Sequence, residues 1–241
     1  MDGIGRITLA RPETHNALDQ DAMRALTTTL NTWQNSGLRA LILTGEGKSF
    51  CAGASLGDVA GSDWAENPLT TLCDTLETFP APTVAALNGG VYGGGVEIAL
   101  ACDFRIGVRG MKAFVPPAKL GIHYEPAGIR RAMDRLGAQV TRRMFLLADT
   151  FSDEDLARVG FLDDLVAGEE LGGAAETLAT RIAGLAPLAV QGMKRTIVEL
   201  SRGTLDEAAA RERVVACFAS EDHQEGLAAF REKREAVFKG G

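Results

Sequence analysis

Histidine and cysteine, the residues that most often hold zinc, are scarce in this sequence of 241 residues. The three histidines are far apart, and so are the four cysteines at Cys51, Cys73, Cys102 and Cys217, with no Cys-x-x-Cys pair among them. This spacing indicates neither a metal site nor a disulfide framework. It favours buried free thiols in a reducing compartment.

The composition also lacks the features of nucleic-acid-binding and membrane proteins. The formal net charge is −7 and the pI is about 5.1, which argues against a polyanion as the main ligand. No apolar run approaches the roughly 20 residues of a membrane-spanning helix. The N-terminus lacks the basic and then apolar pattern of a secretion signal. We therefore expect a cytoplasmic protein with no nucleic-acid or membrane partner.

The common nucleotide and hydrolase motifs are incomplete. Gly47, Lys48 and Ser49 resemble the end of a phosphate-binding loop, but that motif needs a glycine where this chain has Ile42. The glycines between positions 89 and 95 do not match Gly-x-Gly-x-x-Gly in any register. No Gly-x-Ser-x-Gly nucleophile motif occurs. The sequence gives no support to nucleotide binding or to serine hydrolase chemistry of that type.

The hydrophobic pattern predicts an α/β region to about residue 125 and successive helices after it. Strands are expected in "GIGRITLA", "LRALILTG", "PTVAALNG" and "FRIGV", with a helix from Asp19 to the stop at Gly37. A further helix before residue 80 is expected to be interrupted near Pro68. Capping boxes indicate helix starts at Ser152 and Thr204.

Two glycine-rich loops are the most informative feature of the sequence. "SFCAGASLG" follows one predicted buried strand, and "NGGVYGGGVE" follows the next. Ligand sites of α/β folds lie beyond the carboxyl ends of strands, and small residues let backbone N–H groups approach a ligand. A helix is expected to begin near Gly94, which leaves its first N–H groups without internal partners.

Glu97 follows these glycines as a single carboxylate in an apolar run. One N–H group from each loop, aimed at one point, would form an oxyanion hole, and Glu97 could then move a proton beside the polarised carbonyl. The residue types alone favour a purely structural interpretation. The glycines would then form turns only, and Glu97 would offset the helix dipole or support a cap.

Five segments in order and spacing carry a resemblance to a known family: "LARPETHNAL", "KSFCAGASL", "NGGVYGGGVEIALACDFRI", "PPAKLGI" and "SEDHQEGLAAFREKREAVFKG". Together they are similar to the enoyl-CoA hydratase/isomerase (crotonase) superfamily over essentially the whole chain. The resemblance implies a crotonase-like ββα spiral with two roughly perpendicular sheets over residues 1–185. It also implies a helical oligomerisation region over residues 186–241, and a homotrimer or a hexamer built from two trimers.

The same resemblance implies an acyl-CoA thioester substrate and no separate cofactor or metal. The oxyanion hole would be formed by the N–H groups of Ala54 and Gly94, with Glu97 as the acid/base. The positions that match the coenzyme A contacts of the family are Ala17, Leu18, Ala52, Leu56, Phe230 and Lys233. For the last two, packing between subunits is an equally good interpretation.

The chain departs from the family pattern at the second catalytic glutamate. Hydratases carry that residue after a proline, and this chain has Pro117 there, which cannot ionise. Ser55 also stands where aspartate is common. These departures put the ordinary addition of water by two carboxylates in doubt.

Residues just beyond Pro117 offer two replacements. Tyr124 matches a tyrosine of the methylmalonyl-CoA decarboxylase branch, and Glu125 matches an acid of the dienoyl-CoA isomerases. Tyr124 could orient a substrate carboxylate for loss of CO2, or Glu97 and Glu125 could act as a proton-transfer pair. Core packing for Tyr124, a loop position for Glu125 and a surface position for His123 are the structural alternatives. A CoA-binding member with impaired catalysis is the third functional hypothesis.

Overall fold

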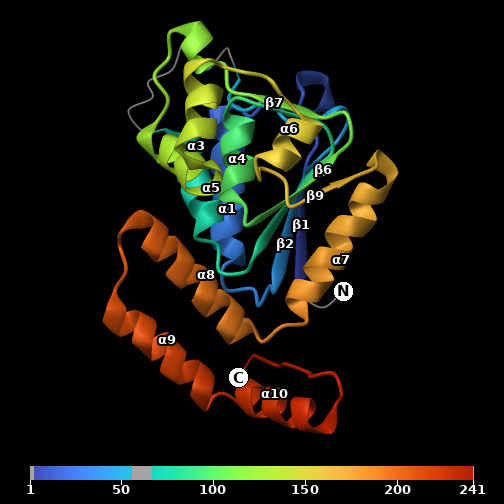
Figure 1. The fold of residues 1–241 in the computed structure, drawn as a ribbon, viewed down its shortest axis with the longest axis vertical. Helices are drawn as coiled ribbons and strands as arrows, with labels where there is room; N and C mark the ends of the chain where they lie inside the picture. The colour runs from blue at the N-terminus through green and yellow to red at the C-terminus, as the bar shows by residue number, and fades with distance from the viewer. Residues whose placement is uncertain (1–2, 56–66, 241) are drawn as a thin grey trace.

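The computed structural model describes residues 3–55 and 67–240 of the chain. Nine strands within the described residues form two sheets, and helices pack around them (Figure 1). The larger sheet has the order β1-β2-β4-β6-β9, and its neighbouring strands are all parallel. Its strands are β1 (Ile4–Leu9), β2 (Ala40–Gly45), β4 (Thr83–Leu87), β6 (Phe104–Val108) and β9 (Asp164–Val166).

The smaller sheet has the order β3-β5-β7-β8, with only the β7–β8 pair antiparallel. Its strands are β3 (Ser49–Cys51), β5 (Gly90–Tyr92), β7 (Lys112–Phe114) and β8 (Phe151–Ser152). Each long strand from β2 to β6 is followed along the chain by a short strand of this second sheet and then by a helix. This repeat confirms the predicted crotonase-like ββα architecture.

Helices cover the sheets and extend the chain beyond them. The α-helices in the described residues are α1 (Gln20–Trp33), α3 (Pro68–Glu77), α4 (Gly94–Ala101), α5 (Pro126–Leu146), α6 (Asp153–Arg158), α7 (Leu171–Ala183), α8 (Pro187–Arg202), α9 (Glu207–Ala219) and α10 (Glu221–Glu232). Helix α7 packs along β2, β4 and β6, and α3 packs against both α1 and α4. None of the helices in these residues has the length and apolar character needed to cross a bilayer.

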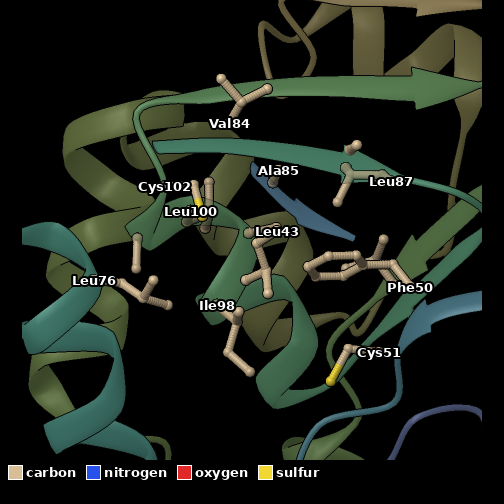
Figure 2. Close-up of a cluster of buried hydrophobic side chains, with 14 of the residues drawn as sticks. Leu43, Phe50, Cys51, Leu76, Val84, Ala85, Leu87, Ile98, Leu100 and Cys102 are labelled. Carbon is tan, nitrogen blue, oxygen red and sulfur yellow. The ribbon is translucent and has the colours of Figure 1, made fainter. Parts of the chain in front are cut away.

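The core lies between the larger sheet and the helices α3 and α4 (Figure 2). Leu43 of β2, Val84 of β4 and Ile98 of α4 are almost fully buried there. Every residue of β4 is buried, which explains why its sequence is a continuous apolar run rather than an alternating one. Cys51 and Cys102 are buried free thiols, as expected from the sequence.

Several local predictions are confirmed and others are wrong. Asp19 caps α1, and Ser152 forms a capping box at α6. Pro68 is the first residue of α3, where the N–H that proline lacks would have no intrahelical acceptor, and the part of the predicted helix before residue 67 lies outside the described residues. Asp206, not Thr204, caps α9 with bonds to two backbone N–H groups. The region after residue 125 is not all helical, because β8 and β9 lie within it.

The last three helices form an arm that leaves the sheets (Figure 1). Lys194 of α8 ties this arm to the α/β region, since its Nζ donates to Asp103 Oδ2 at 2.6 Å and to the Ala81 carbonyl at 3.0 Å. Helices α8, α9 and α10 together line an apolar groove of about 700 Å³. Large apolar side chains on this arm are exposed, among them Met193, Ile197, Phe218 and Phe230.

Candidate active site

The two glycine loops leave neighbouring strands of the smaller sheet. β3 ends at Cys51 and β5 ends at Tyr92, and these two strands pair in parallel. The sequence predicted that the loops directly follow the longer strands, which is wrong, because a three-residue strand lies between each long strand and its loop. The correction strengthens the expected geometry, since parallel neighbours bring their carboxyl ends to one edge.

The backbones of the two loops touch at Gly53 and Gly94. A Cβ atom added to Gly53 would lie 2.4 Å from the Gly94 nitrogen, and Gly53 has a φ of +80°. A Cβ atom on Gly95 would lie 2.2 Å from the Cys51 carbonyl oxygen. Only glycine allows this approach, so these residues are required by the packing of one loop on the other.

The N–H groups of Ala54 and Gly94 are available at this contact. Ala54 bridges to Leu18, with the Leu18 N–H donating to the Gly53 carbonyl and the Ser55 N–H donating to the Leu18 carbonyl. Across residues 3–55 and 67–240, no acceptor is recorded for the Ala54 N–H. Gly94 is the first residue of α4, where N–H groups have no intrahelical acceptor. Two backbone donors therefore lie on facing loops.

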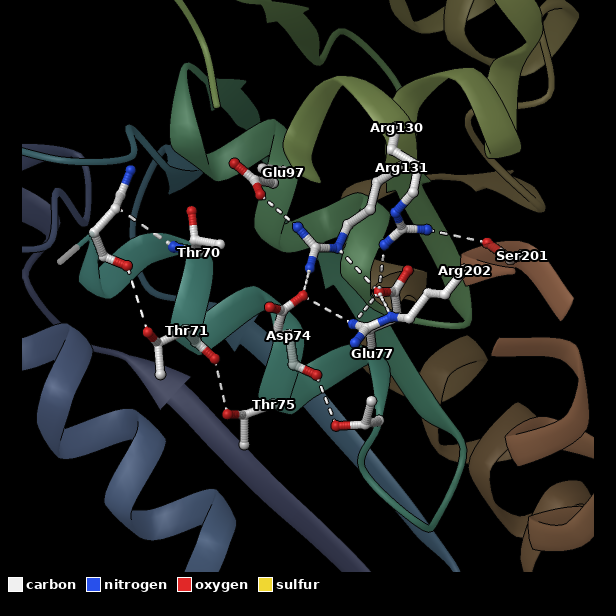
Figure 3. A network of polar contacts seen from close by, with 12 residues as sticks. Thr70, Thr71, Asp74, Thr75, Glu77, Glu97, Arg130, Arg131, Ser201 and Arg202 are labelled. Carbon is white, nitrogen blue, oxygen red and sulfur yellow. Dashed lines mark hydrogen bonds and ion pairs between the residues drawn. The ribbon is translucent and has the colours of Figure 1, made fainter. Parts of the chain in front are cut away.

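Glu97 lies in the first turn of α4, as predicted, and it is 2% exposed. Its Oε1 accepts a hydrogen bond of 2.6 Å from Nη1 of Arg131, which is fully buried (Figure 3). Its Oε2 is buried and, among the described residues, makes no hydrogen bond of normal geometry, although the Tyr124 phenol lies close enough to lower the pKa of this carboxyl by hydrogen bonding. The two oxygens of this carboxylate are therefore inequivalent, because only Oε1 is held by the guanidinium.

Burial and charge act on Glu97 in opposite directions. Burial raises the pKa of the Glu97 carboxyl above its ordinary value, while the positive charge of Arg131 acts to lower it. A carboxylate that is held ionised by one arginine, yet takes up a proton more readily than an exposed glutamate, suits acid/base exchange.

Tyr124 lies beside Glu97, and both side chains are next to Gly128. A Cβ atom on Gly128 would be 2.4 Å from Cε1 of Tyr124 and 2.8 Å from Oε2 of Glu97, so the phenol and the carboxyl both pack directly against this glycine. The Tyr124 ring also packs edge-on against Phe145, with 5.0 Å between ring centroids. Burial raises the pKa of Tyr124 well above its ordinary value, and the charge of Glu97 raises it further. The phenol is therefore a neutral donor near Glu97.

The other candidates near the missing glutamate lie differently. Pro117 begins a short 3-10 helix that ends at Leu120. Glu125 is the half-buried N-cap of α5, and in the described part of the chain its carboxylate joins no recorded ion pair or hydrogen bond. His123 is exposed at the surface, with its Nδ1 2.7 Å from the Tyr124 carbonyl oxygen. The structure thus places Tyr124 directly beside Glu97, whereas among the described residues Glu125 makes no hydrogen bond or ion pair with Glu97.

The residues matched to coenzyme A contacts fall into two groups. Leu18 is buried, and Ala17 and Ala52 are partly buried close to the loop contact. Phe230 and Lys233 lie at the end of α10, where Phe230 is 85% exposed. Leu56 lies outside the described residues.

Sequence reasoning missed the charged residues that hold Glu97. Arg131 comes from α5, and its guanidinium also pairs with Asp74 and Glu77 of α3 (Figure 3). A glutamate in an apolar helix was itself a signal, because a buried carboxylate needs a partner. The doubled arginine at positions 130 and 131 in a helical segment was the place to look for it.

Comparison with known proteins shows the family of this chain. The family model described as enoyl-CoA hydratase/isomerase matches residues 1–241. The chain belongs to the enoyl-CoA hydratase/isomerase family. It is 31% identical to a short-chain-enoyl-CoA hydratase of Clostridium acetobutylicum over 241 residues, covering 96% of this chain and 92% of the relative. It is 33% identical to an enoyl-CoA isomerase/hydratase of Mycosarcoma maydis over 260 residues, covering 100% and 94%.

Solved structures of this family superpose closely on the chain. The crystal structure of an enoyl-CoA hydratase from Bacillus anthracis has a TM-score of 0.89 and 30% identity, with coverage of 99% of this chain and 96% of that one. The chain is therefore an enzyme of the enoyl-CoA hydratase/isomerase kind, with the crotonase fold and an acyl-CoA type of substrate.

Proposed function

We propose that the chain forms the enolate of an acyl-CoA thioester and thereby hydrates or isomerises an enoyl-CoA. The observation that carries this proposal is the buried Glu97 carboxylate, with Oε1 held by Arg131 and Oε2 beside the Tyr124 ring, one helical turn from the contact between the two glycine loops. Coenzyme A enters as part of the substrate, and the proposed chemistry uses only backbone N–H groups and side chains.

In the proposed mechanism, the thioester oxygen accepts hydrogen bonds from the N–H groups of Ala54 and Gly94. These donors stabilise the negative charge that develops on the oxygen when Glu97 removes a proton next to the double bond. In isomerisation, Glu97 returns that proton two carbons away and the double bond moves. In hydration, the oxygen of water bonds to C3 and a proton ends on C2, with Glu97 as the proton carrier.

Decarboxylation of a malonyl-type CoA, such as methylmalonyl- or ethylmalonyl-CoA, is a second candidate that one observation favours. Pro117 supplies no second carboxylate, and the neutral Tyr124 phenol lies beside Glu97. Tyr124 would orient the substrate carboxylate, the C–CO2 bond would break, and its electron pair would form the same enolate. The enolate carbon would then take up a proton. Glu125 stays a predicted proton-transfer partner for hydration or isomerisation.

A mass-spectrometric screen separates these reactions. The purified protein is incubated with crotonyl-CoA, a 3-enoyl-CoA, a dienoyl-CoA and methylmalonyl-CoA. Gain of water, or isomerisation at unchanged mass, is the expected result. Loss of CO2 would instead establish the decarboxylase reaction and make Tyr124 the next residue to change. Tight binding of coenzyme A without turnover of any thioester would favour the catalytically impaired member and contradict the proposal.

The helical arm over residues 186–241 is proposed to assemble the protein into a trimer, or into a hexamer of two trimers, in the cytoplasm. The exposed apolar side chains of α8, α9 and α10 support this assembly. Phe230 and Lys233 would then contact coenzyme A from a neighbouring subunit, while Ala17, Leu18, Ala52 and Leu56 would line its site within the core region of residues 1–185. Light scattering after gel filtration measures the assembly directly, and a monomeric mass would contradict it.

A further inference from the structure

A buried guanidinium occupies one particular oxygen of the Glu97 carboxylate. Arg131 has no exposed side-chain surface, and its Nη1 lies 2.6 Å from Oε1 of Glu97. The other oxygen, Oε2, packs beside Gly128 and the Tyr124 ring, is not bonded by Arg131, and makes no hydrogen bond of normal geometry among the described residues. An arginine fork is rigid and planar, so it fixes the rotation of a carboxylate more strictly than a single point charge does.

We propose that Arg131 is a positioning residue that occupies Oε1 of Glu97 and leaves Oε2 as the oxygen that exchanges a proton with the substrate. This inference rests on the proposed function, because it assigns a working oxygen to the proposed acid/base. Breaking a buried ion pair lowers stability whether or not the pair acts in catalysis. The proposal goes further, because it gives Arg131 a role in the reaction itself.

Arg131 is itself fixed by carboxylates from another helix. Asp74 accepts a hydrogen bond from its Nη2, and Oε2 of Glu77 lies 3.4 Å from its Nε (Figure 3). Arg202, at the end of α8, donates to Asp74 at 2.8 Å and to Glu77 at 3.0 Å. The guanidinium of Arg131 therefore cannot rotate without breaking contacts to α3, and α8 holds those contacts in place.

Among the described residues, four charged or titratable groups face Glu97 from the elements packed against α4. They are Arg131 from α5, Tyr124 from the segment before α5, and Asp74 and Cys73 from α3. Arg131 and Tyr124 act to lower the pKa of Glu97, whereas Asp74 acts to raise it. Because Arg131 and Asp74 act with opposite signs, removal of each charge should move the ionisation of Glu97 in opposite directions.

The test compares three substitutions in the full-length protein. Arg131→Met removes the charge, Arg131→Lys keeps a charge without the fork, and Asp74→Asn keeps the shape but removes the opposing charge. Arg105→Met is the matched control, because Arg105 is a buried arginine paired with Asp163 rather than with Glu97. The activity readout is the pH dependence of deuterium exchange at C2 of butyryl-CoA in D2O, which requires ionised Glu97.

The exchange rate should fall at low pH as Glu97 becomes protonated, and this fall is the acid limb of the pH profile. For Arg131→Met we expect the acid limb to move to higher pH and the rate near pH 7 to be lower by roughly tenfold to 10²-fold. For Asp74→Asn the limb should move to lower pH. Arg131→Lys should restore the position of the limb but only part of the rate. Arg105→Met should destabilise the protein and leave the limb in place. Unmoved limbs in folded Arg131→Met and Asp74→Asn proteins would overturn the proposal.

A second readout does not depend on turnover. A ¹³C NMR titration of labelled glutamate carboxyls, with Glu97→Gln to identify the resonance, follows the ionisation of Glu97 directly in each variant. If the pKa of Glu97 moves in opposite directions in Arg131→Met and Asp74→Asn, the positioning role is supported. Absence of deuterium exchange in the wild type would refute only the proposed function. If Arg131→Met does not fold, Asp74→Asn decides, because its side chain is 43% exposed at the edge of the network.

Discussion

The contact between the two glycine loops gives the sharpest prediction, for the substitution Gly53→Ala. The added methyl group would lie 2.4 Å from the Gly94 nitrogen and 2.9 Å from its Cα, whereas ordinary contact begins near 3.4 Å. The obstacle is backbone rather than a flexible side chain, so the loops must separate by about 1 Å, and a displacement of that size costs roughly 10²-fold in rate. The positive φ of Gly53 adds about 1–2 kcal/mol of backbone strain in alanine.

The assay is kcat with the substrate found in the thioester screen, together with the free energy of unfolding in urea. Gly37→Ala is the control, because Gly37 has a similar φ of +75° and nothing within 4 Å of the added methyl. Gly37→Ala should lose a similar 1–2 kcal/mol of stability without loss of kcat. A folded Gly53→Ala protein with the kcat of Gly37→Ala would refute the reasoning that the loop contact builds the site.

The remaining predictions concern Glu97 and the groups around it. Glu97→Gln should abolish turnover and leave the Kd for coenzyme A nearly unchanged in calorimetry. Gly94→Pro should lower kcat by at least about 10²-fold, because it removes the N–H donor and its ring also meets Gly53 and Leu69; a folded variant with normal kcat would remove Gly94 from the mechanism. Gly128→Ala should lower kcat by roughly tenfold to 10²-fold, because its methyl group displaces the carboxyl of Glu97. Burial acts to raise the pKa of Glu77, but nearby guanidinium groups bring it below its ordinary value of 4.5. Its ionised form therefore stabilises the fold above that pH, and the unfolding free-energy difference between wild type and Glu77→Gln should shrink as the pH falls below it.

The features that could be predicted from the sequence are those set by local chemistry. Glycine runs at strand exits indicated two loops with accessible backbone, and the start of α4 at Gly94 put Glu97 in its first turn. Asp19 and Ser152 caps were readable because a cap is a local hydrogen bond between a side chain and a nearby N–H. These signals span only a few residues.

The features that could not be predicted depend on distant parts of the chain. Strands β3, β5 and β7 have three residues each, too few to show an alternating pattern, and they exist because neighbouring strands pair with them. β9 joins the larger sheet from within the helical region. The pairing of Glu97 with Arg131 joins residues 34 positions apart, and only tertiary packing of α5 on α4 creates it.

Deuterium exchange at C2 of butyryl-CoA tests the central claim most directly, because this saturated thioester can form the enolate but cannot be hydrated, isomerised or decarboxylated. The account predicts that the wild-type protein exchanges the C2 hydrogens in D2O and that Glu97→Gln does not. Absence of exchange in a wild-type protein that binds the thioester, or undiminished exchange in Glu97→Gln, would contradict it.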